Sequence, residues 1–254
     1  MLKWIATLLV VFSLFMLVTR PKYSRNIDLA KLNAKEKAYL APCENKIEHS
    51  GFNQAPEIGD VIQMLSQEFN IETVVETGTF VGETTNFLSK CFEEVHTIEI
   101  VEENMRKAQE VLKEKENIHF HLGSSNAVLK DILPQIENKR TVFYLDAHWN
   151  KYWPLLDELD AIAKTHKDNC LIVIDDFKVP KRRDIPFDQY GAHQCSYKYI
   201  QAKLDDVFSN YDYFYLIPKN VGSRAKFIAF PKQWSLSKGH IFNPKLELTW
   251  PKKN

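Results

Sequence analysis

Between residues 56 and 231 the apolar positions alternate between two spacings. Short runs of β-branched and aromatic residues, typical of buried strands, are separated by stretches in which apolar residues recur every three or four positions, typical of amphipathic helices. A first helix from residue 56 precedes these runs. The predicted strands cover residues 71–76, 95–99, 118–121, 141–146 and 170–175, and the helices between them cover 83–91, 103–115, 126–136 and 155–164.

The pattern changes after the fifth strand. A polar, aromatic segment (177–193) precedes a helix (196–208), and two strands (211–217 and 226–230) follow with only a short turn between them, so they must pair antiparallel. The earlier alternation implies right-handed crossovers and a parallel sheet with helices on both faces. The sequence therefore predicts an α/β, Rossmann-like, doubly wound sheet of seven strands, mostly parallel with a C-terminal antiparallel hairpin.

The N-terminus, outside the domain predicted at 56–231, differs from it in holding an uncharged, apolar run. Residues 4–19 carry no charge and would span roughly 24 Å as a helix, a little short of a hydrocarbon core of about 30 Å. A cleaved signal peptide and a buried helix are the alternatives, but no small-x-small cleavage pattern follows. We expect a single-pass membrane anchor at 1–19, a linker at 20–55 with one short helix at 29–40, and an irregular C-terminal tail at 232–254.

Charge and cysteine content narrow the setting. The 254 residues hold 33 basic and 33 acidic side chains, so no overall field favours nucleic acid as a partner. The bias of basic residues towards the C-terminal flank of the apolar run, with Arg20, Lys22 and Arg25, places the catalytic domain on the cytoplasmic face. Four scattered cysteines are typical of free thiols in a reducing compartment.

The stretch 71–85 carries the first candidate chemistry. A buried strand leads into Glu76, then Gly78 and Gly82, then a helix start. Such a turn brings backbone N–H groups and a helix N-terminus against a ligand, and glycine permits the close approach that a Cβ would block. The alternative is a tight strand-to-helix turn without a ligand.

Polar residues also follow the other predicted parallel strands. Because ligands bind beyond the carboxyl ends of such strands, near the switch in strand order, these residues form one candidate site. Glu99 ends the second strand, roughly 20 residues after Glu76, the spacing at which an acid can bond both hydroxyls of a ribose. The other strand ends hold Gly123, Ser124, Asp146, His148, Asp175 and Asp176.

These motifs resemble the class I S-adenosylmethionine (SAM) dependent methyltransferases, whereas the third glycine of a dinucleotide dehydrogenase is absent. Glu-Thr-Gly-Thr-Phe-Val-Gly-Glu-Thr, with Phe80 in place of a middle glycine, is similar to the form found in metal-dependent O-methyltransferases of the catechol, caffeoyl-coenzyme A and macrolide-sugar type. The segment 143–156 is similar to the Asp-His-Trp-Lys segment of the catechol enzymes, with Ala147 as an extra residue and Asn150 where the lysine would fall.

The resemblance implies a SAM site in which Glu76 and Gly78 face the methionine end, Glu99 the ribose and Ser124 the adenine. The full set of expected cofactor residues is Glu76, Gly78, Thr79, Gly82, Glu99, Ser124 and Asp146.

The resemblance also implies a Mg²⁺ site at Asp146, Asp175 and Asp176, and the physics agrees. Three neighbouring carboxylates without a cation would raise one another's pKa, and Mg²⁺ resolves this while leaving positions for substrate oxygens. The alternative is that Asp176 caps a turn and Asp175 is hydrogen-bonded locally.

Candidates for the general base are His148, which has a suitable ordinary pKa, and Lys151, one residue beyond the expected lysine position. Either could instead be a surface or supporting residue. A basic cluster at 178–183 is read as a solvated loop or as a contact for acidic substrate groups or anionic lipid. The aromatics at 149–153, 187 and 190 could wall a substrate pocket, although Trp153 could equally pack in the core.

The sequence thus predicts a membrane-anchored enzyme that transfers a methyl group from SAM, with help from Mg²⁺, to a hydroxyl oxygen of a small molecule or sugar. Two other classes remain open. One is a metal-dependent enzyme of another kind on the same fold, a glycosyltransferase or a hydroxylase-like tailoring enzyme. The other is a non-catalytic binding protein that keeps the fold.

Overall fold

The computed structural model describes residues 51–251 apart from 149–151, 221 and 237–244. The predicted anchor at 1–19, the helix at 29–40 and all but the end of the linker lie outside these residues. Within the described part, no helix is both long enough and apolar enough to cross a membrane.

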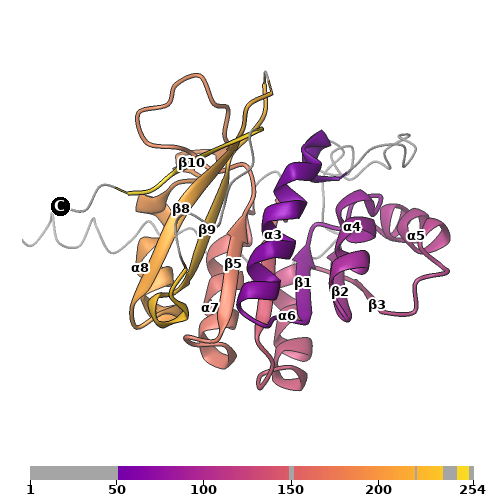
Figure 1. The fold of residues 1–254 in the computed structure, drawn as a ribbon. Coiled ribbons are helices and arrows are strands. Elements are labelled where there is room, and N and C mark those ends of the chain that lie inside the picture. The colour runs from indigo at the N-terminus through magenta and orange to yellow at the C-terminus, as the bar shows by residue number, and fades with distance from the viewer. Residues whose placement is uncertain (1–50, 149–151, 221, 237–244, 252–254) are drawn as a thin grey trace, which may run out of the picture.

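Eight strands form one sheet in the order β10-β8-β9-β5-β4-β1-β2-β3 (Figure 1). Strands β1 to β5 run parallel, and β5–β9, β9–β8 and β8–β10 pair antiparallel. The strand order reverses between β1 and β4, which places a ligand crevice at their carboxyl ends. The strands are β1 (Thr73–Thr77), β2 (Glu94–Glu99), β3 (Ile118–Leu122), β4 (Thr141–Leu145), β5 (Cys170–Ile174), β8 (Tyr211–Pro218), β9 (Lys226–Pro231) and β10 (Leu246–Thr249).

The predicted α/β class, the parallel strands and the terminal hairpin are confirmed, but the count of seven strands is wrong. The eighth, β10, comes from the tail that was expected to be irregular, and it pairs with β8 from Leu246↔Pro218 to Thr249↔Tyr215. Its apolar residues alternate, with Leu246 buried and Leu248 packed against the core. An unpaired β8 edge would expose a row of backbone donors and acceptors, which β10 satisfies.

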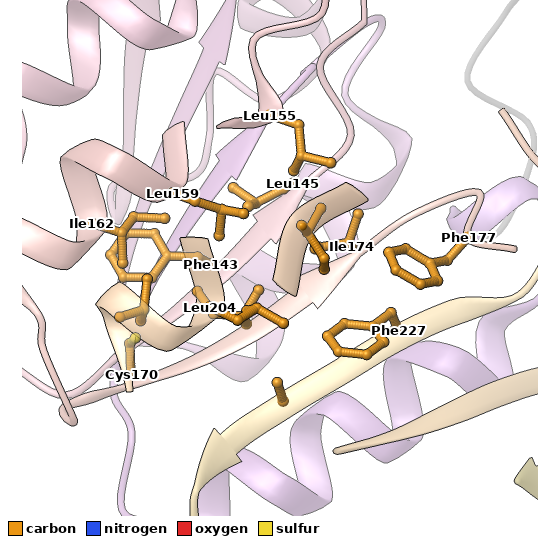
Figure 2. Packing of buried hydrophobic residues seen from close by; sticks show 14 of the residues in the cluster. Phe143, Leu145, Leu155, Leu159, Ile162, Cys170, Ile174, Phe177, Leu204 and Phe227 are labelled. Atoms are coloured by element: carbon orange, nitrogen blue, oxygen red, sulfur yellow. The ribbon is translucent and has the colours of Figure 1, made fainter. Parts of the chain in front are cut away.

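Helices cover both faces of the sheet, and side chains of the central strands alternate between two cores. Val142 and Tyr144 of β4 join the core under α3 and α4, whereas Phe143 and Leu145 join the core under α6, α7 and α8. Figure 2 shows the second core, where Phe143, Leu145 and Ile174 of the sheet face apolar residues of α7 and α8. The helices are α3 (Pro56–Glu68), α4 (Glu83–Cys91), α5 (Glu102–Val111), α6 (Ser125–Ile132), α7 (Leu155–Thr165) and α8 (Tyr197–Val207), with short 3₁₀ turns η2 (Phe52–Gln54), η3 (Leu133–Gln135) and η4 (Lys232–Trp234).

The packed unit is larger than the predicted range 56–231. Phe52, in the segment expected to be linker, is buried and packs edge-on against Phe87 and Tyr144 with ring centroids 5.2 and 5.5 Å away. At the other end Trp234 packs against Phe69 with the rings tilted and their centroids 5.0 Å apart. These contacts add apolar surface to the core from both sides of the predicted domain.

Between β5 and α8, two short strands form a hairpin, β6 (Gln189–Tyr190) and β7 (His193–Gln194). The backbone ties this segment to the end of β5, because Asp188 N–H donates to Asp176 C=O at 2.9 Å and Lys178 N–H donates to Cys195 C=O at 2.7 Å. The hairpin is thereby held next to the carboxyl edge of the sheet. Cys91, Cys170 and Cys195 are free thiols.

Candidate active site

A cavity of about 370 Å³ opens at the carboxyl ends of β1, β2, β3 and β4, where the switch in strand order predicts a ligand. Its walls come from the turn after β1, the end of β2 and the loops after β3 and β4. The residues that line it are Asn53, Gly78, Phe80, Ile98, Glu99, Ile100, Val101, Asn104, Gly123, Ser124, Ser125, Asp146, Ala147, His148, Tyr152 and Pro154.

The turn after β1 needs glycine at position 78. Its φ is 89°, and a Cβ there would lie 2.8 Å from the carbonyl oxygen of Asp146. Gly78 N–H donates to Ile98 C=O at 2.9 Å, which ties the turn to β2. The backbone of β1 can therefore pass directly along the cavity wall. Gly82, also at positive φ, begins α4 and packs against Ala108 rather than lining the cavity.

The carboxylate of Glu99 is fixed at the cavity wall by backbone donors. Its Oε2 accepts from Phe80 N–H at 2.7 Å, and its Oε1 accepts from Val101 N–H at 2.8 Å. Burial raises the pKa of Glu99, and these N–H groups lower it in part. Both carboxylate oxygens keep further acceptor capacity for hydroxyl groups in the cavity.

Glu76 and Thr79, two of the expected cofactor residues, lie behind the cavity wall instead of in it. Glu76 is buried, and its Oε2 accepts from Thr85 Oγ1 at 2.5 Å and from Thr97 Oγ1 at 2.6 Å. Thr79 Oγ1 lies 2.5 Å from Thr97 Oγ1. Burial raises the pKa of Glu76 to about 7, against the two threonine hydrogen bonds. These residues join β1, β2 and α4 and so hold the turn in place.

Ser124 lines the cavity as predicted, and its hydroxyl donates to Asn126 Oδ1 at 2.5 Å. Two further polar residues, Asn53 of η2 and Asn104 of α5, line the cavity and were not predicted. Asn104 lies within a helix, and the sequence offers no motif that marks it. Ser125 of α6, which follows Gly123 and Ser124 at the end of the third strand, also lines the cavity.

The three predicted aspartates meet at the ends of β4 and β5. Asp146, Asp175 and Asp176 each offer a carboxylate oxygen, and these oxygens lie within 4.8 Å of one another. Tyr144 hydroxyl donates to Asp175 Oδ2 at 2.5 Å, and Asp176 N–H donates to Asp175 Oδ1 at 2.5 Å. The predicted clustering is therefore confirmed.

Two cations that the sequence analysis did not single out also enter this cluster. Lys226, the first residue of β9, donates from Nζ to Asp175 Oδ1. Arg224 Nη1 donates to Asp176 Oδ2 at 2.7 Å and to Asp188 Oδ1. The sequence feature that could have identified Lys226 is its place at the start of an apolar strand, Lys-Phe-Ile-Ala-Phe, which was predicted to pair in the sheet.

The contacts of the three aspartates can be compared with what a Mg²⁺ site requires. An oxygen site for a divalent ion needs carboxylates that are free to turn towards it, but Asp175 already accepts from Lys226, Tyr144 and the backbone. Burial would raise the pKa of Asp175, yet the Lys226 ammonium holds it below its ordinary value. With its charge compensated in this way, the cluster as arranged does not fit a divalent metal, and Mg²⁺ stays a prediction from the sequence.

His148, one of the two candidate bases, lies between the main cavity and a smaller adjoining one. Its ring stacks on that of Tyr190 with centroids 5.7 Å apart. Burial lowers the pKa of His148, while Asp188 raises it and Arg224 lowers it. The imidazole ring is therefore uncharged at neutral pH. Lys151 and Trp149 lie outside the described residues.

An aromatic stack stands beside His148. The rings of Trp153 and Tyr199 are parallel, with centroids 4.9 Å apart, and Tyr190 lies 5.3 Å from Trp153. Trp153 lines the smaller cavity and also packs against Tyr199 of α8, so its packing role is observed, whereas its role in a substrate pocket stays a prediction. Tyr190 hydroxyl donates to Asp188 Oδ2 at 2.7 Å, which links the stack to Arg224.

The basic segment 178–183 and Phe187 take no part in these cavities. Lys178 lies over the ring of Phe187 at 4.9 Å and donates to Gln194 Oε1 at 2.7 Å. Arg182 pairs with Asp184 at 2.7 Å and with Glu247 of β10 at 2.9 Å. These contacts favour the reading of this segment as a surface loop.

No protein-family model and no curated protein matches the sequence. Solved structures, in contrast, match the fold. A Klebsiella pneumoniae protein assigned to the O-methyltransferases matches with a TM-score of 0.50 at 14% identity, over 77% of this chain and 86% of its own. The chain has the class I methyltransferase fold. A Bacillus cereus O-methyltransferase in complex with SAH matches at 0.49 and 19% identity, over 87% and 96% of the two chains. The O-methyltransferase TomG of Streptomyces achromogenes, involved in tomaymycin synthesis and in complex with SAM, matches at 0.48 and 17%, over 80% and 98%.

Proposed function

We propose that this protein is a SAM-dependent methyltransferase that methylates a hydroxyl oxygen of a small molecule or sugar. The observation that carries the proposal is Glu99, whose carboxylate is fixed by Phe80 and Val101 N–H groups at the wall of a cavity of about 370 Å³. An acid held in this way at the end of the second strand can accept from both hydroxyls of a ribose. The fold, shared with an assigned O-methyltransferase, supports the same reading.

The residues present fit SAM. Glu99 would hold the ribose, and Ser124 and Ser125 lie on the wall where the adenine would bind. Gly78 and Asp146 would hold the methionine part. Burial and the neighbouring Asp175 raise the pKa of Asp146 well above its ordinary value, so a bound ammonium group would favour its ionised form. SAM supplies an electrophilic methyl group on a sulfonium.

The chain's own residues would then position the acceptor and take its proton. Methyl transfer breaks the carbon–sulfur bond and forms a carbon–oxygen bond, and the hydroxyl proton of the acceptor must leave. His148 lies at the junction of the two cavities, and its lowered pKa leaves it able to accept a proton at neutral pH. The stack of Trp153, Tyr190 and Tyr199 would keep water away from this point.

The metal-assisted form of the reaction, predicted from the sequence, requires more. A Mg²⁺ ion at Asp146, Asp175 and Asp176 would have to displace the Lys226 ammonium from Asp175. We therefore propose that His148 takes the proton of the acceptor and that the reaction needs no metal ion. The glycosyltransferase and hydroxylase-like alternatives share this difficulty where they depend on a metal at the aspartates.

Isothermal titration of the purified full chain in EDTA tests the proposal. We expect SAM and SAH to bind with one site per chain, whereas a uridine diphosphate sugar should give no heat. Glu99→Gln should weaken the binding, and Glu102→Gln, an exposed substitution at the start of α5, should not. A folded protein that binds the sugar nucleotide and not SAM would support a glycosyltransferase instead and contradict the proposal.

The small-molecule acceptor and the location are part of the same proposal. The aromatic side chains beside His148, Tyr190 and Trp153, are suited to contact an acceptor with a flat apolar body. The membrane anchor with a cytoplasmic domain stays a prediction from the sequence. Carbonate extraction of membranes from cells that make the full chain, followed by protease protection, checks it; recovery in the soluble fraction would contradict it.

A further inference from the structure

Lys226 lies where a charged side chain is least expected. It opens β9, and it comes one step beyond the pair Ile174↔Phe227, which places it opposite Asp175 at the end of β5. Its side chain is 1% exposed, and its neighbours Ala225 and Phe227 are buried. Burying an ammonium group is costly unless it is paired and hydrogen-bonded, so the site must supply compensating charge.

That compensation comes from the aspartate cluster. Nζ donates to Asp175 Oδ1 and lies 4.0 Å from Asp176 Oδ1, which accepts no hydrogen bond from the described residues. Asp175, Asp176 and the neighbouring Asp146 supply the negative charge that a buried ammonium group requires. The ammonium therefore faces the three carboxylates that a divalent cation would bind.

Arg224 supplies the second positive charge. Its Nη1 bridges Asp176 and Asp188, so the four carboxylates of the site face two fixed cations. A divalent ion among the aspartates would have to approach the Lys226 ammonium closely, and the two cations would repel each other in a buried setting. The lysine and a metal therefore compete for one place.

We propose that the Lys226 ammonium is the resident cation of the aspartate cluster and takes the position of a divalent metal. What this inference implies for catalysis rests on the proposed methyl transfer. What it implies for metal binding depends only on the side chains of the cluster. Lys226 is a positioning residue, because its burial keeps it from touching an acceptor. It holds Asp175 and the end of β5 at fixed charge and geometry, whereas His148, at the junction of the two cavities, is the group that would face the acceptor.

Mn²⁺ is the probe for the test, because it prefers the same oxygen ligands as Mg²⁺ and its free ion is measured by electron paramagnetic resonance. We expect the wild-type full chain to leave Mn²⁺ free. Lys226→Ala removes the ammonium and opens space beside three carboxylates, so this variant should gain one Mn²⁺ site per chain, at least about tenfold tighter than any in the wild type. Lys226→Arg keeps the charge and should gain none.

Further variants locate the gained site. Adding Asp175→Asn to Lys226→Ala should abolish it, because one of the ligands is then lost. Should Lys226→Ala fail to fold, Lys226→Gln keeps a hydrogen-bond donor for Asp175 without the charge and should show the same gain. One tight Mn²⁺ per wild-type chain that is lost in Asp175→Asn would overturn the proposal, and so would equal Mn²⁺ binding by wild type and both neutral variants.

Two parallel measurements separate this inference from the proposed function. SAM binding in EDTA reports on the cofactor cavity and does not involve Lys226. If SAM fails to bind while Mn²⁺ behaves as expected, the methyltransferase proposal fails and the lysine assignment stands. If SAM binds and the methylation rate of an accepted substrate is unchanged by EDTA, both stand; a rate that EDTA abolishes and Mg²⁺ restores overturns the lysine assignment alone.

Discussion

Gly78 passes so close to Asp146 that a Cβ on Gly78 would lie 2.8 Å from the carbonyl oxygen of Asp146. No side chain fits this approach, and φ at Gly78 is 89°, a conformation that costs an L residue extra free energy. We predict that Gly78→Ala pushes β1 and β4 apart at the cavity, lowers the free energy of unfolding by more than about 2 kcal/mol and abolishes SAM binding. Urea denaturation and isothermal titration measure the two effects.

Gly222 provides the control for this substitution. Its φ of 81° is close to that of Gly78, but a Cβ there meets no atom within 4 Å. Gly222→Ala should therefore show only the strain of a positive φ, on the order of 1 kcal/mol, with SAM binding intact. Equal effects of the two variants would mean that crowding against Asp146 plays no part.

Glu99 offers a more selective change at the cavity wall. Glu99→Gln keeps the shape but replaces one acceptor oxygen by an NH₂ group, which must then face a backbone N–H of Phe80 or Val101. Because two donors are brought together and a ribose acceptor is lost, we predict that the Kd for SAM rises by about tenfold to a hundredfold. The Kd from isothermal titration checks this. A rise of less than about threefold would show that Glu99 does not carry the ribose.

Much of this site could be predicted from the order of the elements. Alternating periodicities identify parallel strands, and parallel strands bring their carboxyl ends to one edge, so Gly78, Glu99, Ser124 and Asp146 were correctly placed together at the cavity. Sequence order cannot say whether a residue at a strand end points to the cavity or away from it. Glu76 and Gly78 are two positions apart, yet Glu76 binds Thr85 and Thr97 behind the wall.

The charges around the aspartates show a second limit of prediction from the sequence. The sequence reveals that Asp146, Asp175 and Asp176 end neighbouring strands, but their counter-charge comes from β9, which follows Asp176 by about 50 residues. Which side chain faces Asp175 depends on the antiparallel register between β5 and β9, and a one-residue slip would turn Lys226 to the other face. Composition and spacing do not fix that register. The β10 strand was missed for a related reason, since pairing with β8 defines it more than its own short pattern does.

Phe52 tests how far the domain extends before the predicted boundary. Its ring packs against Tyr144, whose hydroxyl holds Asp175, so this residue supports the aspartate cluster from behind. Phe52→Ala should lower the free energy of unfolding by about 3 to 5 kcal/mol, as expected for a buried aromatic side chain. Leu122→Ala, at a half-exposed position, is the control and should cost less than about 1 kcal/mol. Urea denaturation of both variants decides whether the segment before α3 belongs to the folded unit.

His148 is the residue expected to take the acceptor proton. His148→Asn keeps a polar group at the junction of the two cavities but removes a base of suitable strength, so kcat should fall by about 10² to 10⁴. The Kd for SAM should change far less than kcat, because Glu99 and Gly78 are untouched. His119→Asn, an exposed change on β3, is the control. Steady-state kinetics with an accepted substrate would contradict the role if kcat fell by less than about threefold.

Glu76 should give the protein a pH-dependent stability of defined sign. Burial raises the pKa of its carboxyl from 4.5 to about 7, so the folded state holds a proton that the unfolded state has lost at intermediate pH. The stabilising effect is complete below about pH 4.5 and is lost as the pH rises through 7, with a total near 3 kcal/mol. Gln accepts the same hydrogen bonds from Thr85 and Thr97 and does not titrate.

Glu76→Gln should therefore match the wild type or fall below it in stability at about pH 5, and exceed it at about pH 8.5, where the wild type must bury an ionised carboxylate. Urea denaturation across this range measures the difference. Glu72→Gln, an exposed change directly before the same strand, should leave the pH profile of the wild type unchanged. Parallel profiles for Glu76→Gln and wild type would show that Glu76 stays ionised in the folded protein, and its hydrogen bonds with Thr85 and Thr97 would then outweigh its burial.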